Sequence, residues 1–389
     1  MNVAGNNNVI HEQDAQAWLR LLRTGAVVPN NSPERYNAVI KASAGTLPWI
    51  RSEWRDDKPI AAVIGKVAER RITSPIAYGF APSLKAKCLD IVYGGILTDG
   101  SASACDWVVD RIVEELQSHR VDVAIIHHIR SDHRAVASLL SGWSHSDEAR
   151  EPHIRYQLAP SPKAHLDAMS RKHRYNVTRS EKLLRKACGE LTLSVVDSPS
   201  EVEEFSACAA AITSAGYQGA LNVGFRALPA QVAAIRAEAE AGRLLCYGLK
   251  TPDKMIAYWV GCRYGDTYFG EATAFHPEYR SLSAGSVLLQ LVFADLISRG
   301  VKEFDYGYGD APYKRMYGTE FWDESTVSLY ATTIRGRAAR LHSIVRAAAA
   351  AASRLSGPYA QRIKTRWRKR LESRAKPADT RASSDNSTT

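Results

Sequence analysis

The sequence of 389 residues is short of cysteine and lacks any long, uninterrupted run of apolar residues. Its six cysteines are scattered without a C-x-x-C pair, which argues against a disulfide framework and against a zinc site. No apolar run approaches the roughly 18 residues that a membrane-spanning helix requires. The first residues show no basic segment followed by an apolar one, so we expect no signal peptide. Together these absences favour a cytoplasmic protein without a bound metal.

Basic residues are unevenly distributed along the chain. The formal net charge is +10, from 51 Lys and Arg against 41 Asp and Glu. Residues 335–389 hold 14 of the basic and 3 of the acidic residues, which leaves 37 basic and 38 acidic residues in the first 334. The body is therefore nearly neutral, and we expect no specific nucleic-acid partner. We expect a basic helical tail at 335–376, which would contact an anionic membrane or remain solvated, and a disordered end at 377–389.

Two halves of the chain show the same order of predicted elements: strands, a helix and a closing strand. In the first half we predict strands at 49–56, 59–72, 88–97 and 121–129, and a helix at Ala104–Ser118. In the second half we predict strands at 243–250, 255–264, Thr267–Phe275 and Lys302–Tyr308, and a helix at Gly285–Ser298. This repetition predicts two α/β domains, at 1–160 and 161–334, each with a mixed, mostly antiparallel sheet flanked by helices.

The second domain begins with further predicted elements. A strongly basic helix spans Arg171–Lys186 and precedes a strand at 191–197. Ser198 is the expected N-cap of the next helix, with Pro199 at its first position and Glu201 completing a capping box. Another helix is predicted at Pro229–Ala241.

The segment "YRSLSAGS" joins the end of a strand to the first turn of a helix. A helix N-terminus offers free backbone N–H groups to a phosphate, although the same pattern also fits an ordinary capped turn. The segment resembles the Arg/Gln-x-x-Gly-x-Gly/Ala loop of GNAT-superfamily acyltransferases and departs from it at Ser283. The resemblance implies that the coenzyme A pyrophosphate is held by Arg280, Ser283, Ala284, Gly285 and Ser286.

The segment "FDYGYGDAPYKRMYG", residues 304–318, supports the same resemblance. It is similar to the Asp-aromatic-Gly-x-Gly and Tyr-Lys-x-x-aromatic-Gly patterns of Fem-like, CelD-like acetyltransferases from cellulose and exopolysaccharide biosynthesis. The resemblance covers residues 165–330, and it extends to the first domain only by layout. It implies two tandem GNAT-like domains. In the second, the strands Thr267–Phe275 and Lys302–Tyr308 would diverge around the acyl-carrying arm of acetyl-CoA or another acyl-CoA.

This resemblance also implies roles for individual residues. Glu271 lies within an apolar strand beside the expected acyl site and is the first candidate for the base, with His276, Tyr308 or a water molecule as the other candidates. Lys314 would stabilise a developing anion. We assign Glu271, Tyr308 and Lys314 to catalysis, and Asp305 and Tyr313 to the wall of the substrate pocket. Strand alternation also allows Asp305 to be a buried, paired carboxylate.

The expected activity is transfer of an acyl group to an amine or hydroxyl of a sugar or of an envelope or exopolysaccharide precursor. One alternative is a Fem-like transferase that uses aminoacyl-tRNA, which would suit the basic helix at Arg171–Lys186. Another is a transferase of the His-x-x-x-Asp type, in which His128 of "HHIRSDH" would be the base. A third is a scaffold without turnover. The expected partners are therefore a small-molecule or saccharide acceptor and, through the tail, anionic lipid.

Overall fold

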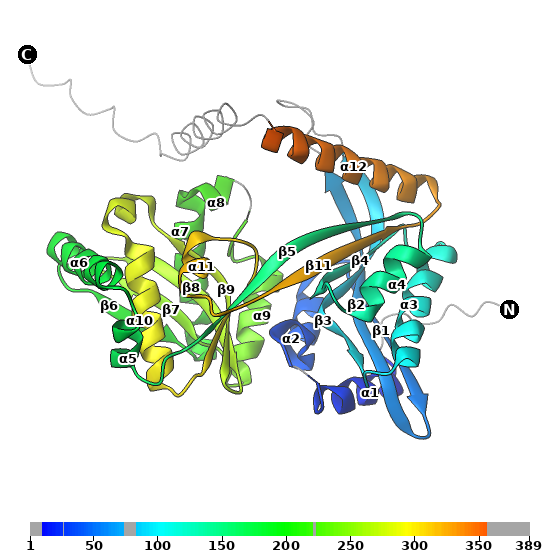
Figure 1. Cartoon of the computed structure of the whole chain (residues 1–389), viewed down its shortest axis with the longest axis horizontal. Coiled ribbons are helices and arrows are strands. Elements are labelled where there is room, and N and C mark those ends of the chain that lie inside the picture. The colour runs from blue at the N-terminus through cyan, green and yellow to red at the C-terminus, as the bar shows by residue number, and fades with distance from the viewer. Residues whose placement is uncertain (1–9, 26, 74–82, 221–222, 356–389) are drawn as a thin grey trace, which may run out of the picture.

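The computed structural model describes residues 10–25, 27–73, 83–220 and 223–355, and it has two lobes (Figure 1). The first lobe is built from α1 (Glu12–Leu22), η1 (Pro29–Asn31), α2 (Pro33–Ala42), β1 (Leu47–Arg55), β2 (Lys58–Thr73), β3 (Ser83–Thr98), α3 (Ala102–Gln117), β4 (Val123–Arg130) and α4 (Arg134–Gly142). The long strand β5 (Ser146–Gln157) leads from this lobe toward the second one.

The second lobe begins with α5 (Pro162–Asp167), α6 (Arg171–Cys188), β6 (Thr192–Val196), η2 (Pro199–Glu201), α7 (Val202–Ala215), α8 (Tyr217–Ala220) and α9 (Pro229–Glu240). It continues with β7 (Cys246–Lys250), β8 (Met255–Tyr264), β9 (Thr267–Phe275), η3 (Pro277–Leu282), α10 (Ala284–Ser298), β10 (Glu303–Tyr308) and α11 (Pro312–Tyr317). The strand β11 (Glu320–Tyr330) and the helix α12 (Ile334–Leu355) return to the first lobe. The expected α/β class is confirmed.

Within the described residues, a sheet of eleven strands runs through both lobes in the order β1-β2-β3-β4-β11-β5-β10-β9-β8-β7-β6. Most neighbouring strands are antiparallel, and each lobe contains one parallel pair. In the second lobe, β10 pairs with β9 only over Glu303–Asp305, although both strands continue beyond that point. In the first lobe, β3 pairs with β4 only over Cys88–Ile91. Each lobe thus has a parallel pair that stops part-way, as the resemblance implied for the second one.

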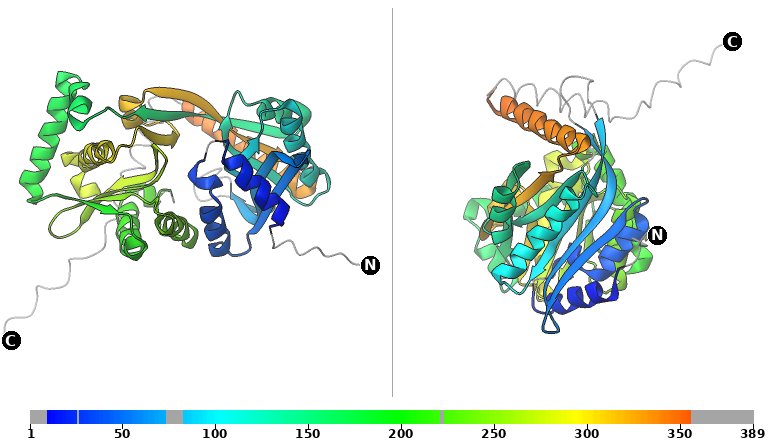
Figure 2. Two further views of the ribbon diagram at one scale, coloured as in Figure 1. Left: turned by 90° about the horizontal axis from the view of Figure 1, so that it is seen from below. Right: turned by 90° about the vertical axis from the view of Figure 1, so that its right-hand side faces the viewer.

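The last strands of the two halves are exchanged. β5, which closes the first half of the chain, pairs with β10 of the second lobe, whereas β11, which closes the second half, pairs with β4 of the first. β5 and β11 also pair with each other along ten residues and form the bridge between the lobes (Figures 1 and 2). A division of the chain at 160/161 follows the order of the elements, but the sheet is continuous across it.

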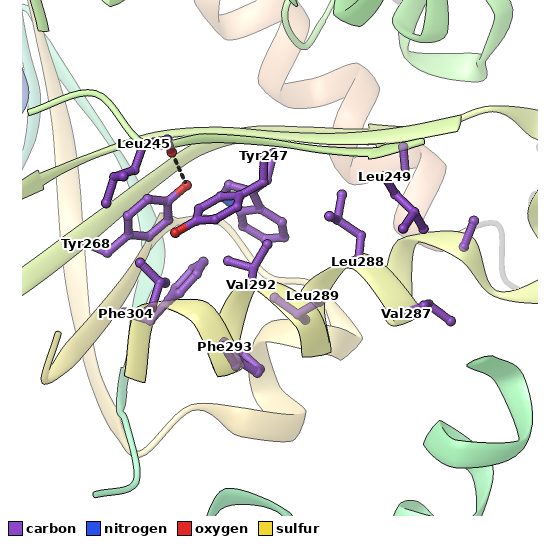
Figure 3. Packing of buried hydrophobic residues seen from close by; sticks show 14 of the residues in the cluster. Leu245, Tyr247, Leu249, Tyr268, Val287, Leu288, Leu289, Val292, Phe293 and Phe304 are labelled. Atoms are coloured by element: carbon purple, nitrogen blue, oxygen red, sulfur yellow. Dashed lines mark hydrogen bonds between the residues drawn. The ribbon is translucent and has the colours of Figure 1, made fainter. Parts of the chain in front are cut away.

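Helices cover both faces of the second lobe's sheet. On one face, α10 buries its apolar side chains against Tyr247, Tyr268 and Phe304 (Figure 3). The Tyr268 hydroxyl reaches this core and donates to the backbone oxygen of Leu245 at 3.1 Å. The opposite face is covered by α7 and α9. This arrangement puts α10 next to the diverging strands β9 and β10, where the resemblance implied an acyl-carrying arm.

Three local features differ from the predicted elements or add to them. Residues 312–317, for which no helix was predicted, form the short helix α11 with Pro312 at its start. Ser198 caps the 3-10 turn η2 through its hydroxyl and the Ser200 N–H, so that α7 begins only at Val202. The first part of the expected helical tail is α12, and Ala339 of this helix is buried against the first lobe. The rest of the expected tail lies outside the described residues.

The described part of the chain contains no helix that is long and apolar enough to cross a membrane. All six cysteines are unpaired thiols.

Candidate functional site

The turn between β9 and α10 has the backbone shape that the phosphate-loop pattern requires. Ser283 stands in the left-handed region, with φ 56° and ψ 38°, directly before the first residue of α10. Glycine adopts this conformation most readily. The pattern has glycine at this position, whereas this chain has Ser283. Among the described residues, the Ser283 hydroxyl caps none of the backbone N–H groups of α10. The Ser286 and Val287 N–H groups donate to the Ser283 backbone oxygen at 2.9 and 3.1 Å, so the N–H groups that a phosphate would meet at the helix start are those of Ala284 and Gly285.

Gly285 brings α10 close to β9. A Cβ atom at this position would lie 2.9 Å from Cδ1 of Phe275, which is closer than real side chains pack. The helix start is thus held against the end of β9, at the open side of the diverging pair. The basic helix α6 contacts both η3 and α10 and so borders the same turn.

A cleft of about 490 Å³ lies between the two lobes. The first lobe lines it with α2 and strands β2 to β4, and the second lobe with α9, β8, β9 and the end of β10. Charged side chains of both signs face it, among them Arg35, Lys66, Arg70, Asp90 and Glu271. Such a lining suits a polar acceptor.

Glu271 stands on the cleft side of β9 at an irregularity of the strand. Val260 of β8 pairs with Ala272 and Gly261 with Gly270, so that Glu271 is the extra residue of a β-bulge. Its two carboxylate oxygens accept hydrogen bonds from the Arg35 guanidinium at 2.5 and 2.7 Å. A base at this position would have to accept a proton while it is held by a cation from the other lobe.

The same arginine belongs to a network around Glu238, a fully buried residue of α9. The Glu238 carboxylate accepts from Arg243 at 2.8 Å and from the Tyr264 hydroxyl at 2.8 and 3.0 Å, and it lies 3.6 Å from Arg35. Burial alone would lower the pKa of Arg35, but the carboxylates of Glu271 and Glu238 raise it by a larger amount. The net pKa is raised, so the guanidinium stays charged. The network ties α2 of one lobe to α9 and β9 of the other.

Tyr308, at the end of β10, reaches across the cleft. Its ring stacks on the imidazole of His128 from β4, with centroids 3.3 Å apart and planes 10° from parallel. The backbone oxygen of Tyr308 accepts a hydrogen bond from Nζ of Lys314 at 2.6 Å. Lys314 is buried, and burial lowers the pKa of its ammonium group. The two residues assigned to catalysis in this segment are therefore in direct contact.

Asp305 lies away from the cleft in a buried polar group at the centre of the sheet. It accepts from the Gly307 N–H at 2.7 Å and pairs with Nε2 of His153 at 2.7 Å. The other ring nitrogen of His153 lies 2.9 Å from Glu324 of β11, and its ring stacks on Trp322. Burial alone would lower the pKa of His153, but the two carboxylates raise it by a larger amount, so its net pKa is raised. Asp305 is thus a buried, paired carboxylate that braces the end of β10.

Tyr313 lies on the opposite face of the sheet from the cleft, in an aromatic group with Tyr306 and Trp259. The Tyr313 ring centroid is 5.9 Å from that of Tyr306 and 6.1 Å from that of Trp259. The Tyr306 hydroxyl and the Trp259 Nε1 are buried, and no hydrogen bond to another described residue satisfies either of them. Two polar atoms on one aromatic wall are therefore buried without a hydrogen-bond partner among the described residues.

The first lobe contributes residues that the second-domain motifs did not indicate. Arg35, Tyr93 and His128 all line the cleft, and none of them belongs to a motif that the resemblance covers. In the rival His-x-x-x-Asp reading, Asp132 would support His128, but Asp132 is exposed and its carboxylate pairs with Arg130 at 3.1 Å. His276, another candidate base, lies before η3 and 3.5 Å from Glu278. In the described ranges, no group of three or more His, Cys, Asp or Glu residues is arranged to hold a metal ion.

Residues 171–315 match the family model described as an acetyltransferase (GNAT) domain. The matched range contains β9, the turn at Ser283, α10, β10 and most of α11. A transferase with a GNAT acetyltransferase domain is therefore supported. No curated protein sequence matches this chain.

Solved structures resemble the whole fold at low sequence identity. The structure of FemX is 10% identical, covers 82% of this chain and 96% of its own, and has a TM-score of 0.56. A conserved protein of unknown function from Bacteroides thetaiotaomicron is 11% identical, with coverages of 82% and 98% and a TM-score of 0.52. The C-terminal domain of a putative lysylphosphatidylglycerol synthetase from Agrobacterium fabrum is 10% identical, with coverages of 85% and 95% and a TM-score of 0.50. These likenesses show that the chain shares a fold with FemX along most of both chains.

Proposed function

We propose that this protein transfers an acyl group from acyl-coenzyme A to an amine or hydroxyl group of an acceptor that binds in the cleft between the lobes. The observation that carries the proposal is the left-handed Ser283 at the start of α10, next to a parallel strand pair that stops part-way. A diphosphate fits the free N–H groups of that helix start, and the acyl arm fits between the unpaired ends of the strands.

Coenzyme A would bind with its pyrophosphate at Arg280–Ser286. Its pantetheine arm carries amide and carbonyl groups, and these would meet the orphaned Tyr306 hydroxyl and Trp259 Nε1. Tyr313 would complete the wall of that channel. The acyl group would then reach the end of β10, beside Tyr308 and close to the cleft.

The chemistry requires a site for the oxyanion and a group that accepts a proton. The ammonium group of Lys314 donates to the Tyr308 backbone oxygen and is thereby fixed at the end of β10. It would stabilise the negative charge that develops on the thioester oxygen. Glu271 stays a candidate for the proton acceptor, and its ion pair with Arg35 also suits a role in orienting the acceptor.

For the acceptor we propose an amino sugar, a sugar hydroxyl or an envelope or exopolysaccharide precursor. The cleft exposes cations and carboxylates from both lobes, which matches a polar molecule with several hydrogen-bonding groups. We place the protein in the cytoplasm, where acyl-coenzyme A is available. The basic tail would hold it at an anionic membrane surface.

A second candidate donor is aminoacyl-tRNA. The specific observation in its favour is the exposed basic face of α6, which contacts the turn η3. Its basic residues are Arg171, Lys172, Arg174, Arg179, Lys182, Arg185 and Lys186. A polyanion longer than coenzyme A would contact this face and the turn together.

One experiment separates these donors. The melting temperature of the protein is measured with acetyl-CoA, with a longer acyl-CoA and with charged tRNA, because a ligand that binds the folded state raises it. We expect a rise with an acyl-CoA that is lost in the Gly285→Val variant. A rise with charged tRNA alone would replace the proposed donor. No rise with any of the three would indicate a scaffold without turnover.

A further inference from the structure

The strand β4 of the first lobe contains a bulge at two consecutive histidines. Ser325 of β11 pairs with Ile129 and Val327 pairs with Ile126, so that His127 and His128 together face the single residue Thr326. His128 takes the left-handed conformation, with φ 49°. A side chain other than glycine is rarely found there and is strained unless its surroundings hold it in place.

The second lobe repeats this bulge at the corresponding strand. β10 follows α10 as β4 follows α3, and on it Tyr306 and Gly307 together face Ile154 of β5. The left-handed residue in this copy is Gly307, with φ 67°. The second lobe therefore uses glycine for the same backbone shape, whereas the first lobe places an imidazole there. The bulge explains the conformation but not the choice of histidine.

The surroundings of His128 direct its ring into the cleft between the lobes. The ring is one wall of the cleft and stacks on Tyr308, which ends the strand beside the expected acyl group. Tyr93 from β3 meets the same ring edge-on, with centroids 6.3 Å apart. Nδ1 of His128 is buried, and no hydrogen bond from a described residue satisfies it. Nε2, which is not buried and has no hydrogen bond to a described residue, is the ring nitrogen that an acceptor in the cleft would meet.

We infer that His128 is the group that takes the proton from the acceptor, and that the first lobe contributes this catalytic residue to a reaction whose donor is bound by the second. This inference rests on the proposed function. As the acceptor nitrogen or oxygen attacks the thioester carbon, a new N–C or O–C bond forms and the C–S bond breaks. The unprotonated imidazole nitrogen accepts the proton of the nucleophile. The resulting imidazolium returns it to the leaving thiolate, which departs as coenzyme A thiol.

The electrostatics agree with this role. Burial lowers the pKa of His128 to about 4, although Glu324 opposes the shift, so the ring is neutral and able to accept a proton at neutral pH. Glu271, by contrast, has both oxygens engaged by Arg35. The stacked Tyr308 ring lies parallel to the imidazole and keeps its orientation fixed.

The test replaces His128 with glycine and, separately, with asparagine. Both residues accept a positive φ, so neither variant should melt below the wild type. Thiol release from acetyl-CoA is followed with glucosamine, hydroxylamine or water as the acceptor, and acetyl-CoA binding is measured by calorimetry. The matched control is His119→Gly, since His119 also has a positive φ, 56°, but lies exposed beyond the end of α3.

We expect both His128 variants to lose at least about 100-fold in kcat, with acetyl-CoA affinity unchanged. Added imidazole should restore part of the activity of His128→Gly, which leaves room for it, and should not restore His128→Asn. His119→Gly should match the wild type. Full turnover in His128→Gly would overturn the inference and leave the proposed function intact. A wild type that does not bind acetyl-CoA, or binds it without turning over any of the three acceptors, would overturn both.

Discussion

Replacement of Glu238 by alanine should destabilise the whole molecule, because its carboxylate is the centre of the polar contact between the lobes. The side chain is fully buried on α9. It pairs with Arg243 at 2.8 Å, accepts from the Tyr264 hydroxyl and lies 3.6 Å from the buried Arg35. Without it, two guanidinium groups and one hydroxyl lose a partner inside the protein, and Arg35 keeps only Glu271.

The expected loss is about 1.5–3 kcal/mol, the usual contribution of hydrogen bonds to a charged group, because Arg35 stays paired with Glu271 and Arg243 with Glu34. The glutamine variant should lose less, since an amide oxygen can still accept from Tyr264 and only the charge is removed. With a urea slope of about 3 kcal/mol per M, the alanine variant's unfolding midpoint would fall by roughly 0.5–1 M. The matched control is Glu240→Ala, an exposed position two residues further along α9.

Urea unfolding followed by circular dichroism measures the difference. The reasoning predicts the order wild type and Glu240→Ala, then Glu238→Gln, then Glu238→Ala. If Glu238→Ala unfolds at the same urea concentration as Glu240→Ala, the buried network contributes nothing to stability. A loss of acetyl-CoA binding with an unchanged midpoint would instead indicate that α9 acts on the site alone.

Three further outcomes are expected. Gly285→Val should weaken acetyl-CoA binding in calorimetry at least tenfold, because its Cβ would lie 2.9 Å from the Phe275 ring and force α10 away from β9. The control is Gly142→Ala, at an open position. Unchanged affinity of Gly285→Val would mean that the coenzyme binds at another place. The pKa of His153 is raised, so its imidazolium stabilises the fold below about pH 6.5, and this contribution is lost as the pH rises through the raised pKa. The melting temperature of the wild type should therefore fall over that pH range, and the melting temperature of His153→Gln should not. A wild-type melting temperature that does not change with pH would contradict this. Removal of residues 359–389 should preserve acetyl-CoA binding and abolish salt-sensitive binding to anionic vesicles, since each basic residue near lipid contributes about 1 kcal/mol. Vesicle binding that survives the truncation would show that the tail is not the membrane-binding segment.

The sequence predicted the second lobe well because its elements carry strong local signals. The predicted strand Thr267–Phe275 agrees with β9, and the helices predicted at Pro229–Ala241 and Gly285–Ser298 differ from α9 and α10 by one residue at one end. Gly300, with φ 73°, follows α10 as expected for a residue beyond a helix end. The apolar residues of these elements recur with the period of a strand or of a helix, and turn residues stand at the ends of the elements. Local patterns were therefore sufficient to predict them.

The central bridge could not be predicted from local patterns. β5 contains Pro152 and several charged residues, and its strand conformation depends on pairing with β11 and β10 on its two sides. β11 pairs with a strand formed about 200 residues earlier, Val327 with Ile126 for example. The exchange of these strands is a property of the assembled sheet, and no spacing within either half indicates it.

The candidate site divides in the same way. The turn at Ser283 and the residues Lys314 and Tyr308 lie within short segments, and the sequence indicated them through one motif each, although not the contact between Lys314 and Tyr308. The partner of Glu271 is Arg35, 236 positions away, and the partner of Tyr308 is His128, 180 positions away. Contacts between separate lobes leave no periodic trace in a single sequence, so the carboxylate was predicted without its cation.

The strand exchange gives a physical reason why the two lobes can share one site. His128 is fixed by β11, since its backbone N–H donates to the Thr326 hydroxyl at 3.4 Å, and Tyr308 is fixed by β5, since it pairs with His153. β5 and β11 pair with each other along ten residues, so a hydrogen-bonded ladder connects both sides of the cleft. Two domains joined by a linker could separate and lose the stacked rings, but here such motion would break the ladder. A cleft built in this way holds its reacting groups in place before the acceptor arrives, which lowers the entropic cost of bringing them together.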